Sequence, residues 1–190
     1  MNNIKKKTIS LIIMIALIIL SLPTYGCGMR STVQVQVIDA ETKQPIDNAV
    51  VLIYWLKPET FLFMRYPGTK EVELKETVSD KNGYFAMPRY GNKDYEYILT
   101  IYKKGYVCWN NEIVFPTNAR RTDFMLKNGV VIAMDRFKEE YSKLEHAGFV
   151  NTCSVAGSSL QNPSVFNEAI KEEKQLYLDW YRKLDKKWTK

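Results

Sequence analysis

Apolar and polar residues alternate strictly over residues 32–37, where valines take every second position and polar residues the positions between. A period of two is typical of a strand with one buried face. Residues 48–56 instead form a continuous apolar run rich in β-branched residues, which predicts a central strand. One face of that strand would carry Ala49, Val51, Ile53 and Trp55.

Further short strands follow at near-regular spacing, separated by residues that favour turns. We predict them at residues 71–78, 84–87, 95–102, 106–109 and 121–126. Asn82 and Gly83 tolerate positive φ and indicate a tight turn, and Pro88 ends the strand after it. Regularly spaced short strands predict a mainly β chain with an antiparallel sandwich of about seven strands over residues 32–127.

The period changes in residues 128–190, which we predict to be a two-helix extension. Met134, Phe137, Tyr141 and Leu144 recur at helical spacing, with Gly148 as a C-cap. We expect a loop over residues 149–161 and a second helix from Asn162-Pro163. Its apolar stripe comprises Phe166, Ile170, Tyr177, Trp180, Tyr181, Leu184 and Trp188. The stripe would pack on the sandwich or form a surface for a partner or for membrane headgroups.

Residues 1–26 have the pattern of an export signal. Three lysines at residues 5–7 precede an apolar run over residues 9–22, and Pro23 ends it. The run is shorter than the roughly 20 residues of a membrane-spanning helix. An uncleaved N-terminal membrane helix is the alternative interpretation.

The tetrapeptide Thr24-Tyr25-Gly26-Cys27 resembles the lipobox of bacterial lipoproteins, in which a small residue precedes the cysteine that receives the lipid. The resemblance implies acylation, such as palmitate, on Cys27, a tether over residues 27–31 and attachment to the cell envelope through the membrane. Gly28 rather than Asp follows the cysteine, which in Gram-negative lipoproteins goes with the outer membrane. Conventional cleavage that leaves Cys27 as a free thiol is the alternative.

Charge and cysteine content narrow the possible partners. The leader holds three of the 27 basic residues and none of the 21 acidic ones, so the exported part carries a net charge of only +3. Together with export, this argues against a nucleic-acid partner. With Cys27 acylated, Cys108 and Cys153 remain, and an oxidising compartment predicts a disulfide between them.

Three groups of residues carry a resemblance to a known family. They are Val37-x-Asp39, Thr42, Pro45-Ile46 and Ala49-x-Val51; then Ser79-Asp80-x-x-Gly83-x-Phe85-x-x-Pro88; then Lys104-Gly105-Tyr106. This order resembles the carboxypeptidase regulatory-like domain and covers residues 32–127. The resemblance implies a transthyretin-like, or prealbumin-like, sandwich. It also implies a non-catalytic role, because the peptidase chemistry of that family lies in a different domain.

The sequence offers little material for catalysis. His146 is the only histidine and follows Glu145 near an expected helix end, where a surface or capping role is the usual one. The paired glutamates at 139–140 and 172–173 read as solvated helix faces. We therefore expect no enzymatic activity, no cofactor and no metal site, with a cryptic hydrolase as the remaining enzymatic hypothesis.

An aromatic insertion gives the candidate binding surface. Residues 57–70 are long for a hairpin loop and rich in aromatic side chains. The candidate residues are Phe61, Phe63, Tyr66 and Trp109, with Tyr54 and Trp55 beside them. They could bind a carbohydrate, a peptide or an envelope protein, or else cover an open end of the sandwich. The leading hypothesis is a non-enzymatic, membrane-anchored envelope lipoprotein that acts as a binding or structural module.

Overall fold

The computed structural model describes residues 32–59, 68–88, 96–154 and 164–188. The predicted signal, the tether with Cys27, and the aromatic residues Phe61, Phe63 and Tyr66 lie outside these ranges. In the described chain, no helix is both long and apolar enough to cross a membrane.

The first sheet has three strands in the order β4–β1–β9. They are β1 (Thr32–Asp39), β4 (Tyr84–Pro88) and β9 (Val130–Met134). The β4 strand pairs antiparallel with β1, so that Val35 lies opposite Phe85. The β9 strand pairs parallel with β1, so that Val37 lies opposite Ile132. The sequence had predicted an antiparallel sandwich, and the parallel pair of β1 and β9 differs from that prediction.

The second sheet has four strands in the order β3–β2–β5–β6. They are β2 (Val50–Glu59), β3 (Gly68–Val78), β5 (Glu96–Tyr102) and β6 (Trp109–Asn110). The two sheets together confirm the predicted sandwich of about seven strands. A separate small hairpin is formed by β7 (Ile113–Val114) and β8 (Ala119–Arg120).

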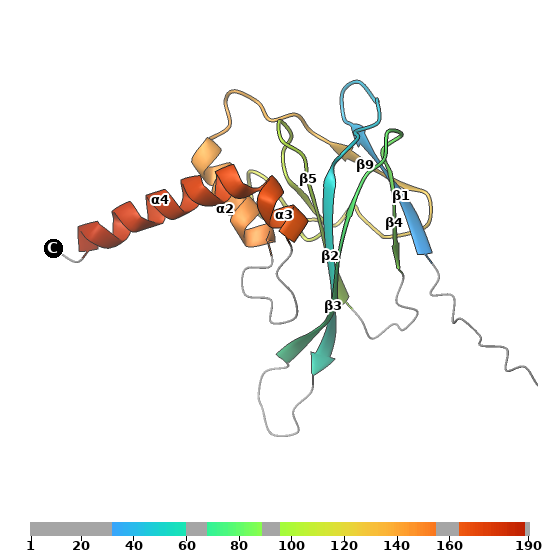
Figure 1. The fold of residues 1–190 in the computed structure, drawn as a ribbon, viewed down its shortest axis with the longest axis horizontal. Coiled ribbons are helices and arrows are strands. Elements are labelled where there is room, and N and C mark those ends of the chain that lie inside the picture. The colour runs from blue at the N-terminus through green and yellow to red at the C-terminus, as the bar shows by residue number, and fades with distance from the viewer. Residues whose placement is uncertain (1–31, 60–67, 89–95, 155–163, 189–190) are drawn as a thin grey trace, which may run out of the picture.

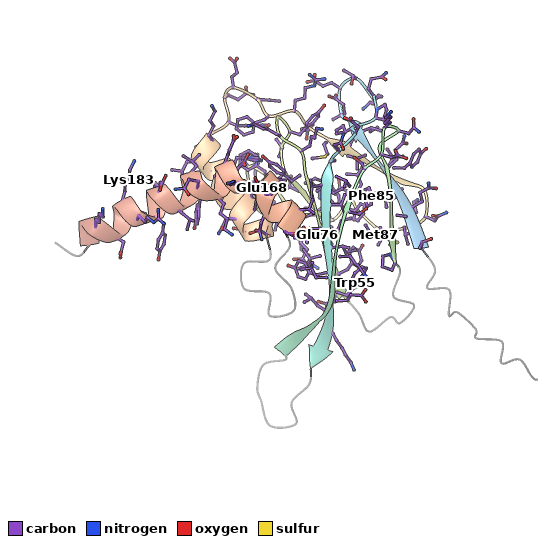
Figure 2. All side chains as sticks on the ribbon, viewed as in Figure 1. Trp55, Glu76, Phe85, Met87, Glu168 and Lys183 are labelled. Carbon is purple, nitrogen blue, oxygen red and sulfur yellow. The ribbon has the colours of Figure 1, made fainter. Side chains whose placement is uncertain are left out.

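The main core lies between the two sheets. The inward valines of β1 and the predicted face of β2 belong to it, which confirms both patterns. Figure 2 labels three side chains of this layer, Trp55, Phe85 and Met87. Its buried members are Val33, Val35, Val37, Ile46, Ala49, Val51, Ile53, Trp55, Phe85, Met87, Leu99, Ile101, Trp109, Ile132 and Met134.

Two motif residues close the turns at one end of the sandwich. Gly83 has φ +74°, and a Cβ there would lie 2.3 Å from the Val37 carbonyl oxygen, so a side chain is excluded. The buried Ser79 hydroxyl donates to the Ile46 carbonyl at 2.7 Å and accepts from the Ala49 N–H at 2.8 Å. These contacts explain why both residues occur in the motif.

Three helices cover the outer face of the second sheet and form a third layer (Figure 1). They are α2 (Lys143–Cys153), α3 (Ser164–Ala169) and α4 (Lys171–Trp188). Val50 and Leu52 of β2 share a second apolar cluster with Phe149 of α2, Phe166 of α3 and Ile170, which lies between α3 and α4. Packing of the helical extension on the sandwich is therefore confirmed, and β2 is buried on both faces.

The boundary between sandwich and extension differs from the prediction. Residues 121–126 contain no strand, and β9 supplies the last one instead, so the sandwich runs past residue 127 to Met134. Ile132 and Met134 point into the core with period two. The helical pattern read from Met134 onward was therefore wrong. The first helix of the extension, α2, begins only at Lys143 and contains Gly148, the predicted C-cap. It continues to Cys153, into the residues predicted as a loop.

Candidate functional site

Of the predicted aromatic surface, the structure describes Tyr54, Trp55 and Trp109, and it places both tryptophans in the core. Trp109 is 7% exposed and packs in the core, with the Phe124 ring centroid 4.8 Å away and the Arg121 guanidinium 4.7 Å above it. Trp55 is also buried in the core. Neither indole can therefore stack on a ligand in this structure.

The segment predicted as a loop over residues 57–70 is in part a hairpin. The β2 and β3 strands continue into it until Glu59 pairs with Gly68. Backbone pairing thus accounts for the six outer residues of the insertion, 57–59 and 68–70. Phe61, Phe63 and Tyr66 lie between the paired ends, outside the described residues.

The predicted Cys108–Cys153 disulfide is absent, because both cysteines are free thiols. The structure does bring them together in the second apolar cluster, where both are buried. The hydrogen bond that the Cys108 thiol donates to the Cys153 side chain, followed by burial, raises the pKa of Cys108. The helices are held to the sheet by apolar packing here, and the thiols act as small hydrophobic groups.

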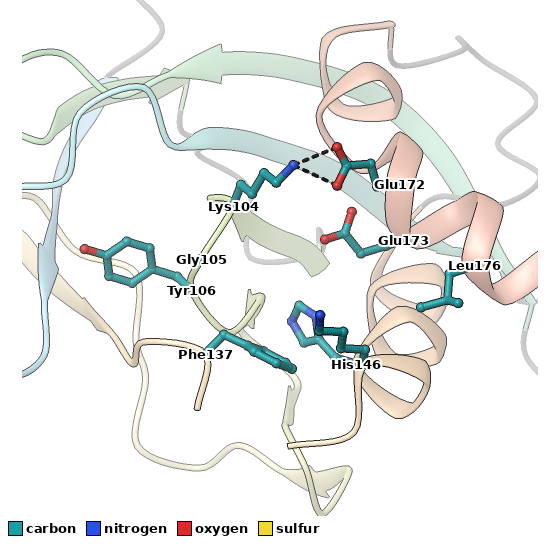
Figure 3. A pocket seen from close by; sticks show the side chains of 9 residues that line it. Lys104, Gly105, Tyr106, Phe137, His146, Glu172, Glu173 and Leu176 are labelled. Atoms are coloured by element: carbon teal, nitrogen blue, oxygen red, sulfur yellow. Dashed lines mark hydrogen bonds and ion pairs between the residues drawn. The ribbon is translucent and has the colours of Figure 1, made fainter. Parts of the chain in front are cut away.

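A pocket of about 230 Å³ opens where the helices meet the edge of the sandwich, and we call it the junction pocket (Figure 3). Its lining residues come from the turn after β5, the segment after β9, and helices α2 and α4. They are Lys104, Gly105, Tyr106, Phe137, Lys143, His146, Glu172, Glu173 and Leu176.

A glycine turn builds one wall of the junction pocket. Gly105 has φ +88°, and the turn is closed by a hydrogen bond from the Tyr106 N–H to the Lys103 carbonyl at 3.0 Å. The Gly105 carbonyl accepts from the Phe137 N–H at 2.9 Å. This bond fixes the segment that carries Phe137 against the turn.

Helix α4 contributes two carboxylates with different surroundings. Glu172 is exposed and receives both of its hydrogen bonds from the Lys104 ammonium, at 2.6 and 2.7 Å. Glu173 Oε1 accepts from the Tyr102 hydroxyl, while its Oε2 is buried and has no hydrogen-bond partner in the described chain. Burial, together with this bond to Glu173, raises the pKa of Tyr102 above its ordinary range.

His146 forms the floor of the junction pocket and is only 5% exposed. Its Nε2 accepts from the Cys108 backbone N–H at 3.0 Å, so the neutral ring carries its proton on Nδ1. Burial lowers the pKa of His146. The ring packs edge-on against Phe115, with centroids 5.2 Å apart. The sequence had suggested a surface or capping role, and that interpretation was wrong because α2 is displaced from its expected position.

The lining of the junction pocket suits non-covalent binding. None of its nine residues is a serine, threonine or cysteine that His146 could activate as a nucleophile. No group of three or more potential metal ligands occurs in the part of the chain that the structure describes. The site offers one lysine–glutamate ion pair, one partly satisfied carboxylate and an imidazole N–H, beside the apolar surfaces of Phe137 and Leu176.

Comparison with protein-family models gives no match, and none is found among curated proteins. Solved structures resemble the chain only loosely. The C-terminal domain of the shaft pilin spaA from Lactobacillus rhamnosus GG is 19% identical with a TM-score of 0.35, over 56% of this chain and 99% of that one.

Two further structures show a similar level of likeness. A streptococcal ancillary pilin is 18% identical with a TM-score of 0.30, over 58% of this chain and 30% of that one. The 3-chlorocatechol 1,2-dioxygenase from Rhodococcus opacus is 14% identical with a TM-score of 0.32, over 56% of this chain and 59% of that one.

Proposed function

We propose that the chain is a non-enzymatic module of the bacterial cell envelope, exported and anchored to a membrane through a lipid on Cys27. The observation that carries this proposal is the position of the folded body relative to the leader. The predicted leader ends at Gly26, directly before Cys27, and β1 begins at Thr32. The tether of residues 27–31 can span roughly 17 Å when extended, so the body would stay close to the bilayer.

A binding or structural role is supported by how the body is built. Two apolar clusters join both sheets and the helices into one unit. A binding or structural module needs such a unit to hold its contact surfaces in place. The junction pocket offers ion-pairing and hydrogen-bonding groups, and no serine, threonine or cysteine lines it. The motif resemblance to the carboxypeptidase regulatory-like domain supports a transthyretin-like sandwich and the same non-catalytic role.

The aromatic segment over residues 60–67 is the proposed contact with an envelope protein or glycan. In Figure 1, the β2–β3 hairpin that carries this segment extends below the point where β1 begins, so it projects past the rest of the sandwich. Replacing Phe61 and Phe63 by Ser should leave the melting temperature unchanged and remove partners captured from solubilised envelope. A large fall in melting temperature would instead assign these side chains to the interior.

Anchoring is tested by mass and by phase partitioning of the native protein. The exported chain should enter the detergent phase and carry acyl mass on Cys27. Cys27→Ser should leave the precursor uncut or release the protein, whereas the neighbouring Gly28→Ser variant should remain anchored. An unmodified Cys27 at the mature N-terminus would disprove the anchor.

A further inference from the structure

The apolar face of α4 extends beyond the surface that covers it. Ile170, directly before α4, is buried. In the first half of the helix the Tyr177 ring lies against Gly148 of α2, where an added Cβ would be only 3.5 Å from the ring. In Figure 1 the second half of α4 continues past α2 and away from the body. The same face therefore changes from packed to uncovered within one helix.

Two aromatic residues occupy the uncovered part of this face. Trp180 and Tyr181 follow Tyr177 at positions i+3 and i+4, which places them on the same side of the helix. They are 39% and 59% exposed, and the Trp180 ring lies 5.8 Å from that of Tyr177. Large aromatic side chains held together in water indicate a contact surface.

The charge of α4 is also uneven. Its first four residues, 171–174, hold two lysines and two glutamates, whereas residues 179–188 hold four cations and two aspartates. Lys183 and Lys186 are exposed, and no hydrogen bond or ion pair to another described residue is found for either. Lys183 points away from the helix into solvent (Figure 2). A second copy would bring the same positive charge to this surface, whereas an anionic surface complements it.

We propose that the projecting half of α4, residues 179–188, binds the surface of a membrane that contains anionic lipids. Trp180 and Tyr181 would enter the headgroup region, and the lysines of the polar flank would face anionic headgroups. Tryptophan and tyrosine prefer this interface because each has an apolar body and a polar tip. A helix with one aromatic face and a cationic polar face lies in the plane of the interface.

This inference extends the proposed function, because anchoring through Cys27 would supply the nearby membrane. The test therefore uses the chain from residue 27 with Cys27→Ser, which cannot be acylated, so failure of the anchor does not affect it. The probe is sedimentation with vesicles of phosphatidylcholine, with or without phosphatidylglycerol. We expect binding to the anionic vesicles, weaker binding as salt is added, and little binding to the neutral ones.

Matched variants assign the binding to α4. Trp180→Ser with Tyr181→Ser should lower partitioning roughly tenfold or more, because both interfacial side chains are lost. Lys183→Gln with Lys186→Gln should lower it roughly 30-fold, since each cation near an anionic surface contributes about a factor of five. As a control, Tyr84→Ser with Val131→Ser removes exposed apolar side chains of the sandwich and should leave partitioning to anionic vesicles unchanged.

Two results would overturn the proposal. In the first, the Trp180→Ser, Tyr181→Ser protein binds anionic vesicles as well as its parent. In the second, the parent is a dimer in sedimentation equilibrium, ignores vesicles, and becomes a monomer with these two substitutions. That result would assign the surface to a second copy of the chain.

Discussion

The Arg136 Nε donates a hydrogen bond of 2.7 Å to Oδ2 of Asp39, a carboxylate that is almost wholly buried at the end of β1. The Tyr106 hydroxyl donates to the same oxygen at 2.9 Å, and the Glu41 and Thr42 N–H groups donate to Oδ1. Asp39 therefore joins β1 to the glycine turn of the junction pocket and to the segment after β9. The Thr42 N–H and the Arg136 guanidinium hold its pKa well below the usual range.

The lowered pKa of Asp39 predicts a loss of stability in acid. A carboxyl group whose pKa is lower in the folded than in the unfolded chain stabilises the fold fully above the unfolded value, near 3.9. Its contribution is lost as the pH falls from about 4 toward the folded value. In urea titrations, Asp39→Asn should lower the free energy of unfolding at pH 7 and flatten this acid loss. The exposed Asp135→Asn should do neither, and an unchanged acid slope in Asp39→Asn would contradict the assignment.

His146 predicts a second pH dependence, at higher pH. Burial lowers its folded pKa, so protonation favours the unfolded chain. Stability should be fully present above the unfolded value, near 6.5, and should fall as the pH drops from about 7 to 5. Because His146 is the only histidine, His146→Ala should remove most of this slope. At pH 7.5 the same variant should lose about 1–3 kcal/mol, since the Cys108 N–H loses its acceptor. A parent protein with flat stability between pH 7 and 5 would rule this out.

Phe166 should determine whether the helices stay on the sheet. The side chain is 0% exposed and packs against Tyr102, with ring centroids 6.5 Å apart. Phe166→Ala should cost about 3–5 kcal/mol of stability and increase hydrogen exchange in α3 and α4. The neighbouring Val165 is half-exposed, so Val165→Ala should change stability by less than about 0.5 kcal/mol. A cost below about 1 kcal/mol for Phe166→Ala would show that the helices are not held by this cluster.

The two buried cysteines should behave as free thiols. In the Cys27→Ser chain, two thiols should titrate in denaturant without reductant, and neither should react quickly in the folded protein, because both are shielded from solvent. An intact mass lower by two hydrogen atoms would show that the bond predicted from the sequence forms after all.

Local pattern in the sequence was sufficient to identify the strands β1 and β2 and their buried faces. The alternation at residues 32–37 determined which side chains of β1 face the core, and the apolar run at 48–56 identified β2 as a central strand. The turn at Gly83 was likewise readable, because the Asn-Gly dipeptide is itself a turn signal. The continuous run in β2 also agrees with burial on both faces, which a strand between two layers requires.

Only the tertiary structure decided which distant segments meet. The parallel pairing of β9 with β1 joins residues about a hundred positions apart, and no local period records it. The burial of Trp109 depends on Arg121 and Phe124, and that of His146 depends on where α2 packs. The uncovered face of α4 is a tertiary property too. The apolar stripe is continuous in sequence, but α4 continues past α2 (Figure 1). Packing therefore buries Phe166 and Ile170 at the start of the stripe and leaves Trp180 and Tyr181 exposed.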